Sequence, residues 1–168
     1  MLDLVKIREY AKEKHAGQKY GEHDYVYHLD MVYAVAVEHN LPDVVRAAAY
    51  LHDVLEDTPT TYSDIVDEFG SEELANLVHC VTDEKGKNRK ERKALTYPKI
   101  RSNENAVALK LCDRIANILE SAHNNESLFK MYRKEQPDFE ANLKVGESNK
   151  SLWDAVNLFF KLDEGSNG

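Results

Sequence analysis

Four side chains that can bind a cation or move a proton lie close together in the chain, at His52, Asp53, Glu56 and Asp57. They follow two turns of mainly apolar sequence, and their spacing predicts that all four share one broad face of a helix. Three carboxylates on such a face repel one another unless water or a cation lies between them. A solvated helix end would explain an acidic cluster, but acidic groups at a helix C-terminus oppose the helix dipole. Because this unfavourable position also carries a histidine, we interpret the cluster as a cation site.

A second polar stripe interrupts an apolar run that begins at Ala106. Its members occupy positions i, i+3, i+4 and i+7 of one helical face: Lys110, Asp113, Arg114 and Asn117. Such a stripe either lines a polar cleft or joins buried salt pairs, and we favour the cleft. A further imidazole is available from His28, at the start of another expected helix.

Positive charge is concentrated in the segment 85–93, which holds six lysines and arginines. An exposed, solvated helix face explains such a segment as well as an anion site does. Lys85, Arg89 and Lys93 are spaced to share one face, from which they could donate charge-assisted hydrogen bonds to a small anion.

The elements that must position these residues are helices, because apolar residues recur at intervals of three and four and alternating β-type patterns are absent. The expected helices begin at Leu4 and then cover 26–39, 42–55, a short segment ending at Gly70, 71–81, 105–121, 126–143 and 148–162. Thr61 or Ser63 can cap the short one. We therefore predict a single all-α domain over residues 1–163, followed by a frayed tail at 164–168.

Composition restricts the class of partner. The 168 residues carry a formal net charge of −8, which argues against a protein that coats nucleic acid but allows a small anionic substrate. Cys80 and Cys112 are too few for a disulfide framework, so we expect two reduced thiols. Neither a signal peptide nor an apolar run of ~20 residues is visible, so we expect a cytoplasmic protein without a membrane partner. The sequence leaves open whether the chain forms a homo-oligomer.

In chain order, His28, then His52-Asp53, then Asp113 resemble the H…HD…D pattern of the HD-domain metal-dependent phosphohydrolases. Longer segments resemble the hydrolase domains of the RelA/SpoT type, namely HAGQ at 15–18, AAYLHDVLEDT at 48–58 and LKLCDRIAN at 109–117. The likeness covers about residues 5–125. That family removes the 3′-pyrophosphate from the alarmones ppGpp and pppGpp. The resemblance thus implies an HD-domain bundle of about eight to nine helices and a small hydrolase without the synthetase domain of longer members.

The resemblance also implies a metal site. His28, His52, Asp53 and Asp113 would bind one divalent cation, commonly Mn²⁺ in this family, and mixed imidazole and carboxylate ligands suit such an ion. Glu56 and Asp57 would orient the attacking water and accept its proton.

Further residues are expected around this centre. Those expected to contact a nucleotide substrate are Lys85, Arg89, Lys93, Asn117 and Tyr20. The three cations would bind phosphates, the asparagine would hydrogen-bond the nucleotide, and the tyrosine is a candidate for stacking on a base. Lys110 and Arg114 are expected beside the ligand carboxylates, which they would hold in place.

Two departures from the family pattern leave the substrate open. Alarmone hydrolases usually carry an Arg-Lys pair soon after the His-x-Gly-Gln element, whereas this chain has KYGEHD at 19–24. Leu29 follows His28 where a proline is usual. The first hypothesis is an alarmone hydrolase. The second keeps the chemistry but changes the substrate to another phosphorylated nucleotide or dinucleotide. The third, a metal-bearing regulatory module without significant catalysis, would not need both Glu56 and Asp57.

Overall fold

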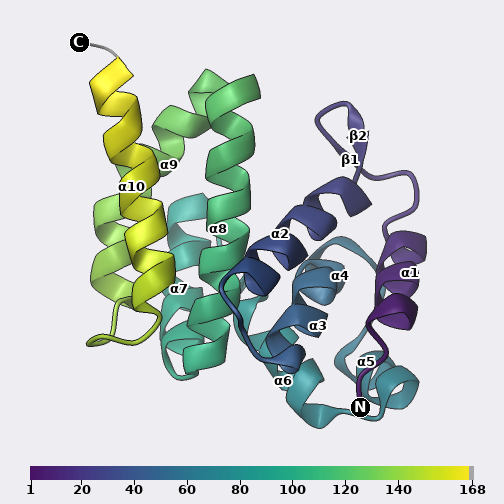
Figure 1. Cartoon of the computed structure of the whole chain (residues 1–168). Coiled ribbons are helices and arrows are strands. Elements are labelled where there is room, and N and C mark those ends of the chain that lie inside the picture. Colours follow the sequence, from purple (N-terminus) through teal and green to yellow (C-terminus); the bar gives the residue numbers. More distant parts are fainter. Residues whose placement is uncertain (167–168) are drawn as a thin grey trace.

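The computed structural model describes residues 1–166 and is built almost entirely of helices (Figure 1). The helices are α1 (Leu4–Lys14), α2 (Val26–Glu38), α3 (Asp43–Leu51), α4 (Val54–Asp57), α5 (Tyr62–Phe69), α6 (Glu72–Val81), α7 (Arg89–Arg101), α8 (Glu104–Asn124), α9 (Glu126–Leu143) and α10 (Lys150–Ser166). Two short strands, β1 (Lys19–Tyr20) and β2 (His23–Asp24), pair as an antiparallel hairpin between α1 and α2. The predicted all-α class is confirmed. The two strands were not predicted, because strands of two residues are too short to leave an alternating pattern in the sequence.

The long helix α8 lies at the centre of the fold (Figure 1). It packs against α2, α3 and α6 on one side and against α7, α9 and α10 on the other. Its apolar residues, such as Leu109, Leu111 and Ile118, are fully buried. Any polar side chain on this helix therefore needs a partner or a cavity.

Side-chain caps account for several helix starts. Thr61 and Asp64 form a capping box at α5, which ends at Gly70 with a φ of +64° that favours glycine. Ser71 caps α6, and Asn103 caps α8. Of the two residues expected to cap α5, the structure uses Thr61.

The expected helix over 42–55 is divided in two. α3 ends at Leu51, and α4 begins at Val54, because Asp53 has a φ of −105° and a ψ of 0°, which interrupts the helical ladder. The prediction of a single helical face for the four chemical residues is therefore wrong. Glu56 and Asp57 belong to the first turn of α4, so the dipole argument for a cation does not apply to them.

The basic segment is also divided. α7 begins only at Arg89, because the side chain of Asn88 accepts a hydrogen bond from the backbone N–H of Glu91 and caps the helix. Lys85 lies in the preceding loop, so the expectation that it shares a helical face with Arg89 and Lys93 is wrong. At the other end of the chain, α10 includes the first part of the expected tail, and residues 167 and 168 lie outside the described residues.

Both cysteines are free thiols, as expected, and burial raises the pKa of Cys112 to about 12. Among the described residues, no helix combines the length and apolar character needed to cross a membrane.

Candidate metal centre and cavity

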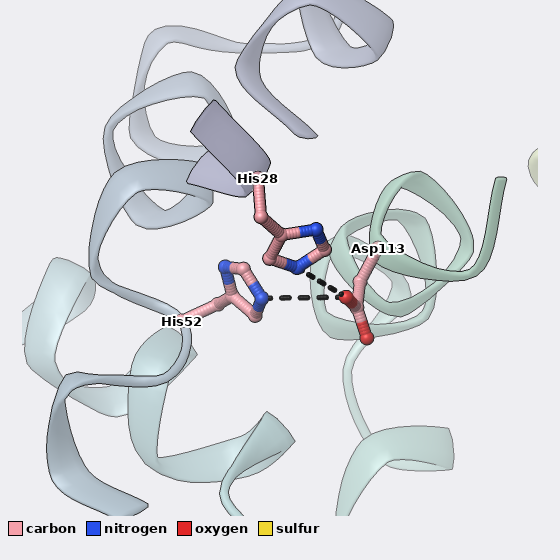
Figure 2. Close-up of side chains that lie close together, drawn as sticks. All are labelled: His28, His52 and Asp113. Atoms are coloured by element: carbon pink, nitrogen blue, oxygen red, sulfur yellow. Dashed lines mark hydrogen bonds and ion pairs between the residues drawn. The ribbon is translucent and has the colours of Figure 1, made fainter. Parts of the chain in front are cut away.

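Three of the residues expected to bind a metal come from separate elements and point toward one another (Figure 2). His28 lies on α2, His52 follows α3, and Asp113 lies on α8. Oδ1 of Asp113 lies 3.1 Å from Nε2 of His28 and 3.3 Å from Nε2 of His52. All three are buried, and their potential ligand atoms lie within 4.8 Å of one another.

Asp53, the fourth expected ligand, borders this cluster. Its Oδ2 lies 2.9 Å from Nε2 of His52 and 4.0 Å from Nε2 of His28. The same oxygen accepts a 2.5 Å hydrogen bond from the hydroxyl of Tyr25. The structure thus brings together all four residues that the H…HD…D pattern singled out.

The hydrogen bonding of His52 leaves one ring nitrogen available. Nδ1 donates to the carbonyl of Ala49 at 2.8 Å, so the proton of the neutral ring lies on Nδ1. Nε2 is buried without a hydrogen bond and faces the carboxylates. An imidazole that is anchored through one nitrogen and presents the other is the arrangement found for histidine ligands of metals. Together with carboxylate oxygen, this donor set fits a divalent transition-metal ion.

The charged groups at this centre shift one another's pKa values. Burial alone would lower the pKa of His52, but the adjacent charges of Asp53 and Asp113 raise it well above its usual value. Burial likewise opposes ionisation of Asp113, yet Lys110, His28 and His52 hold the pKa of that carboxyl well below its usual range. The pocket thus favours ionised carboxylates and positive charge between them.

Two neighbours on α8 hold Asp113 in place. Nζ of Lys110 donates to Oδ2 at 3.0 Å, and the amide of Asn117 donates to Oδ1 at 2.9 Å. The expected position of Lys110 beside a ligand carboxylate is what the structure shows. Although burial opposes its charge, the carboxylates of Asp113 and Asp83 raise the pKa of Lys110.

The residue after Asp113 has a different role from the one expected. Arg114 donates to Oε1 of Gln136 and to the carbonyl of Tyr132, both at 2.7 Å, and its guanidinium lies over the ring of Phe139. These contacts are all with α9. Consecutive residues of a helix point about 100° apart, so Arg114 cannot follow Asp113 toward the metal centre. The expectation that it holds the ligand carboxylates is wrong.

The two acids of α4 are held from different sides. A carboxylate oxygen of Glu56 accepts a 2.5 Å hydrogen bond from the backbone N–H of Asp83, and Asp57 accepts one of 2.9 Å from the amide of Gln18. Partial desolvation raises the pKa of Glu56, against the lowering effect of the Asp83 N–H. The pKa of Glu56 is therefore closer to neutral pH than that of an ordinary glutamate.

A cavity of about 720 Å³ adjoins this centre. Its wall includes His28, Asp53, Glu56, Asp57 and Asp113. The basic residues Lys85, Arg89, Arg92 and Lys93 also line it, together with Asn117 and the aromatic rings of Tyr97, Tyr132 and Phe139. One concave surface therefore joins the metal-binding residues to the basic segment.

Two of the expected phosphate-binding residues already bind carboxylates. Arg89 donates to Glu135 on α9, and Lys93 donates to Asp83 at 2.9 Å. Burial and the nearby charge of Lys110 lower the pKa of Lys93. A phosphate that enters the cavity would have to compete with these partners.

Tyr20 lies over the metal centre. Its ring stacks on His28 with 4.6 Å between centroids, and its hydroxyl donates to Asn117 at 2.8 Å. Asn117 thus links the hairpin to Asp113.

Sequence reasoning missed three residues that contact the expected ligands or acids, namely Tyr25, Gln18 and Asp83. Gln18 belongs to the HAGQ element, so the family likeness marked its segment but not its contact with Asp57. The hydrogen bond from Tyr25 to Asp53 and that from Asp83 to Glu56 join residues far apart in sequence, and no local pattern signals them.

Comparison with known proteins agrees with this site. The chain is 33% identical over 167 residues to the Drosophila melanogaster enzyme named guanosine-3′,5′-bis(diphosphate) 3′-pyrophosphohydrolase MESH1. This match covers 96% of this chain and 91% of the relative. It is 36% identical over 122 residues to the Aquifex aeolicus enzyme of the corresponding name, but that match covers 69% of this chain and only 17% of the relative.

Solved structures and a family model agree. A structure described as a metazoan orthologue of SpoT that hydrolyses ppGpp matches with a TM-score of 0.83 and 27% identity, covering 95% of this chain and 94% of the other. A Listeria monocytogenes EGD-e protein matches with a TM-score of 0.66 and 26% identity, covering 82% of this chain and 94% of the other. A family model described as the HD domain matches residues 8–139. With the H…HD…D residues gathered at one site, these matches show that the chain belongs to the HD domain family.

Proposed function

We propose that this chain is a metal-dependent hydrolase that removes pyrophosphate from the 3′ position of guanosine-3′,5′-bis(diphosphate), ppGpp. The observation that carries the proposal is the convergence of two imidazoles and two carboxylates at the wall of a cavity that basic residues also line. A volume of about 720 Å³ suits a nucleotide with several phosphates. The enzyme name of the Drosophila relative, which matches over nearly its whole length, supports this substrate.

His28, His52, Asp53 and Asp113 would hold one divalent cation, which we propose is Mn²⁺. Mixed imidazole and carboxylate ligands suit a borderline-to-hard divalent transition metal such as this ion, whereas thiolate ligands favour softer ions. When bound, such a cation supplies Lewis acidity at a phosphoryl oxygen and lowers the pKa of water.

Glu56 and Asp57 would handle the attacking water. Glu56 would accept its proton, since a base with a raised pKa is better matched to proton transfer near neutral pH. Asp57, held by Gln18 at the same wall of the cavity, would orient the water.

The basic residues of the cavity would bind the phosphates. Arg89 and Lys93 would exchange their carboxylate partners for phosphate oxygens, and Lys85 would contribute from the loop. Asn117 would bind the nucleotide, and Tyr20 is a candidate contact for the base because its hydroxyl reaches Asn117. Such a small soluble substrate agrees with the expected cytoplasmic location.

A second candidate substrate, another phosphorylated nucleotide or dinucleotide, is favoured by one observation. The hairpin that stands where the family's Arg-Lys pair is expected has Lys19 bound to Asp24 at 2.5 Å, so this cation is already neutralised. A nucleotide without guanine would need no such pair.

Incubation with Mn²⁺ and a panel of nucleotides separates these candidates. The panel holds ppGpp, GTP, ATP and a dinucleotide phosphate without guanine, and the assay distinguishes pyrophosphate from orthophosphate. Pyrophosphate released from ppGpp supports the first candidate, whereas orthophosphate released from another nucleotide supports the second. No product from any nucleotide contradicts both.

A further inference from the structure

The segment between α1 and α2 contacts two of the acids in the proposed site. It leaves α1 at His15, forms the β1–β2 hairpin and returns at Tyr25. The backbone N–H of Tyr25 donates to the carbonyl of Gln18 at 3.1 Å, and the N–H of Gln18 donates to the carbonyl of His15 at 3.0 Å. These bonds close the segment at its base. They fix the backbone positions of His15, Gln18 and Tyr25 relative to one another.

The first contact is between Tyr25 and Asp53. The tyrosine hydroxyl donates to Oδ2 of the carboxylate at 2.5 Å, and its ring lies at the cavity wall. On its other side, the ring packs against the imidazole of His15, with 4.7 Å between centroids. The hydroxyl therefore restricts the rotation of the Asp53 carboxylate, which lies between α3 and α4 and makes no side-chain cap hydrogen bond.

The second contact runs from His15 through Gln18 to Asp57. Nδ1 of His15 lies 2.7 Å from Oε1 of Gln18, an oxygen that can only accept, so the imidazole donates this bond. His15 is 3% exposed, and its ring is fixed by Tyr25. With its oxygen occupied in this way, the Gln18 amide turns its NH₂ group to Oδ2 of Asp57 at 2.9 Å. Asp57 is an exposed side chain that would otherwise rotate freely.

We propose that the segment from His15 to Tyr25 is a positioning unit for both carboxylates, in which Tyr25 orients Asp53 and Gln18, itself oriented by His15, orients Asp57. This inference rests on the proposed function, in which Asp53 is a metal ligand and Asp57 a catalytic group. The two arms have different consequences. Loss of the Tyr25 hydroxyl weakens metal binding, whereas loss of the Gln18 amide slows turnover and leaves metal binding intact.

Metal affinity tests the first arm without any need for substrate. Calorimetric titration of Mn²⁺ compares wild type with Tyr25→Phe and with the matched control Tyr27→Phe, whose hydroxyl donates to Glu120 instead. We expect a loss of affinity of about 10- to 100-fold for Tyr25→Phe, the range typical of groups that orient metal ligands, and none for Tyr27→Phe. Equal affinities in all three proteins, with unchanged thermal unfolding, overturn this arm.

Turnover tests the second arm. Gln18→Leu is expected to lower kcat by about tenfold or more with unchanged KM and Mn²⁺ affinity. In an Asp57→Asn background the same substitution should have no further effect, because Gln18 acts through Asp57. His15→Asn, which keeps a donor near the position of Nδ1, should retain more turnover than His15→Phe.

The possible failures are distinguishable. If wild type hydrolyses ppGpp and Gln18→Leu matches it while Asp57→Asn is slow, the inference is wrong and the proposed function stands. An additive loss in the double variant, which a merely structural role would produce, also overturns it. If wild type hydrolyses no nucleotide of the panel, the proposed function fails and the Gln18 arm fails with it, whereas the Mn²⁺ titrations still decide the Tyr25 arm.

Discussion

Arg89 donates two hydrogen bonds to Glu135, from Nε at 2.7 Å and from Nη2 at 3.2 Å. The pair joins α7 to α9 at the wall of the cavity, next to the proposed metal centre. It means that a cation expected to bind phosphate is preorganised by a carboxylate before any substrate arrives. Substrate phosphate would replace one charge-assisted contact with another, so the net gain from Arg89 is smaller than that of an unpaired arginine.

The first prediction concerns this arginine. Arg89→Gln should raise KM for the nucleotide about tenfold, as expected for the loss of one charge-assisted hydrogen bond, with a smaller effect on kcat. Lys90→Gln, on the next residue of α7 but outside the cavity wall, is the matched control and should behave as wild type. Steady-state kinetics at constant ionic strength measure both, and equal KM values for the two variants would show that Arg89 does not bind the substrate.

A second prediction concerns stability and pH. Burial alone would raise the pKa of Glu135, but the hydrogen bond and charge of Arg89 lower it below its usual value. A carboxyl with a lowered folded-state pKa stabilises the fold above its unfolded-state pKa, and this contribution disappears as the pH falls through the folded-state pKa. Because the pair is partly exposed, Glu135→Gln should cost about 0.5–1 kcal/mol at pH 7 and nothing in acid. Denaturant unfolding across pH measures this difference.

The matched control is Glu140→Gln on the same helix, where Glu140, with a side chain that is 34% exposed, pairs with Lys144 within α9 and its C-terminal end. It should cost less at pH 7 than Glu135→Gln does. A cost for Glu135→Gln that does not change with pH would contradict the ion-pair explanation.

The third prediction concerns the proposed base. Glu56→Gln should leave Mn²⁺ affinity unchanged and lower kcat by about 10²- to 10⁴-fold, the range for loss of a general base. Since catalysis needs the carboxylate, wild-type activity should fall as the pH drops through the raised pKa of Glu56, at a higher pH than an ordinary glutamate would give. The pH–rate profile measures this acid limb. If Glu56→Gln instead loses the metal, Glu56 is a ligand and its assigned role is wrong.

The fourth prediction concerns the metal ligands. Asp113→Asn should lower Mn²⁺ affinity at least 100-fold and remove hydrolysis. Loss of a group that only orients a metal ligand costs up to about 100-fold, so loss of a ligand itself should cost at least as much. Asp154→Asn, on an exposed carboxylate of α10 that pairs only with Lys150 among the contacts described, is the control. Because Asp113 also neutralises the partly buried Lys110, thermal unfolding must confirm that the variant remains folded. Full Mn²⁺ affinity in a folded Asp113→Asn protein would exclude this residue as a ligand.

Much of the fold was predictable because each helix carries its own signals. The apolar run that begins at Ala106 predicted a helix over 105–121, and α8 is the central helix of the fold. The break at Asp53 was not predictable, since neither glycine nor proline marks it and the conformation depends on tertiary contacts such as that with Tyr25. The start of α7 at Arg89 was open to prediction, because Asn88 is a favourable cap.

The residues of the site likewise include some that the sequence could identify and others that only the packing of helices reveals. The resemblance to the H…HD…D pattern named His28, His52, Asp53 and Asp113, and the structure gathers them. The partners of the basic residues could not be named, because Glu135 meets Arg89 only through the packing of α7 against α9. Arg114 was misassigned for a simpler reason. Its neighbour Asp113 faces the metal centre, and adjacent positions on a helix face different directions.

The most direct test of the central claim is a titration of Mn²⁺ into chelator-treated protein while pyrophosphate release from ppGpp is followed. The account predicts no release without the ion, a rise that saturates at one ion per chain, and pyrophosphate as the product. Pyrophosphate release that is unchanged by removal of the metal, or orthophosphate as the only product, would contradict it.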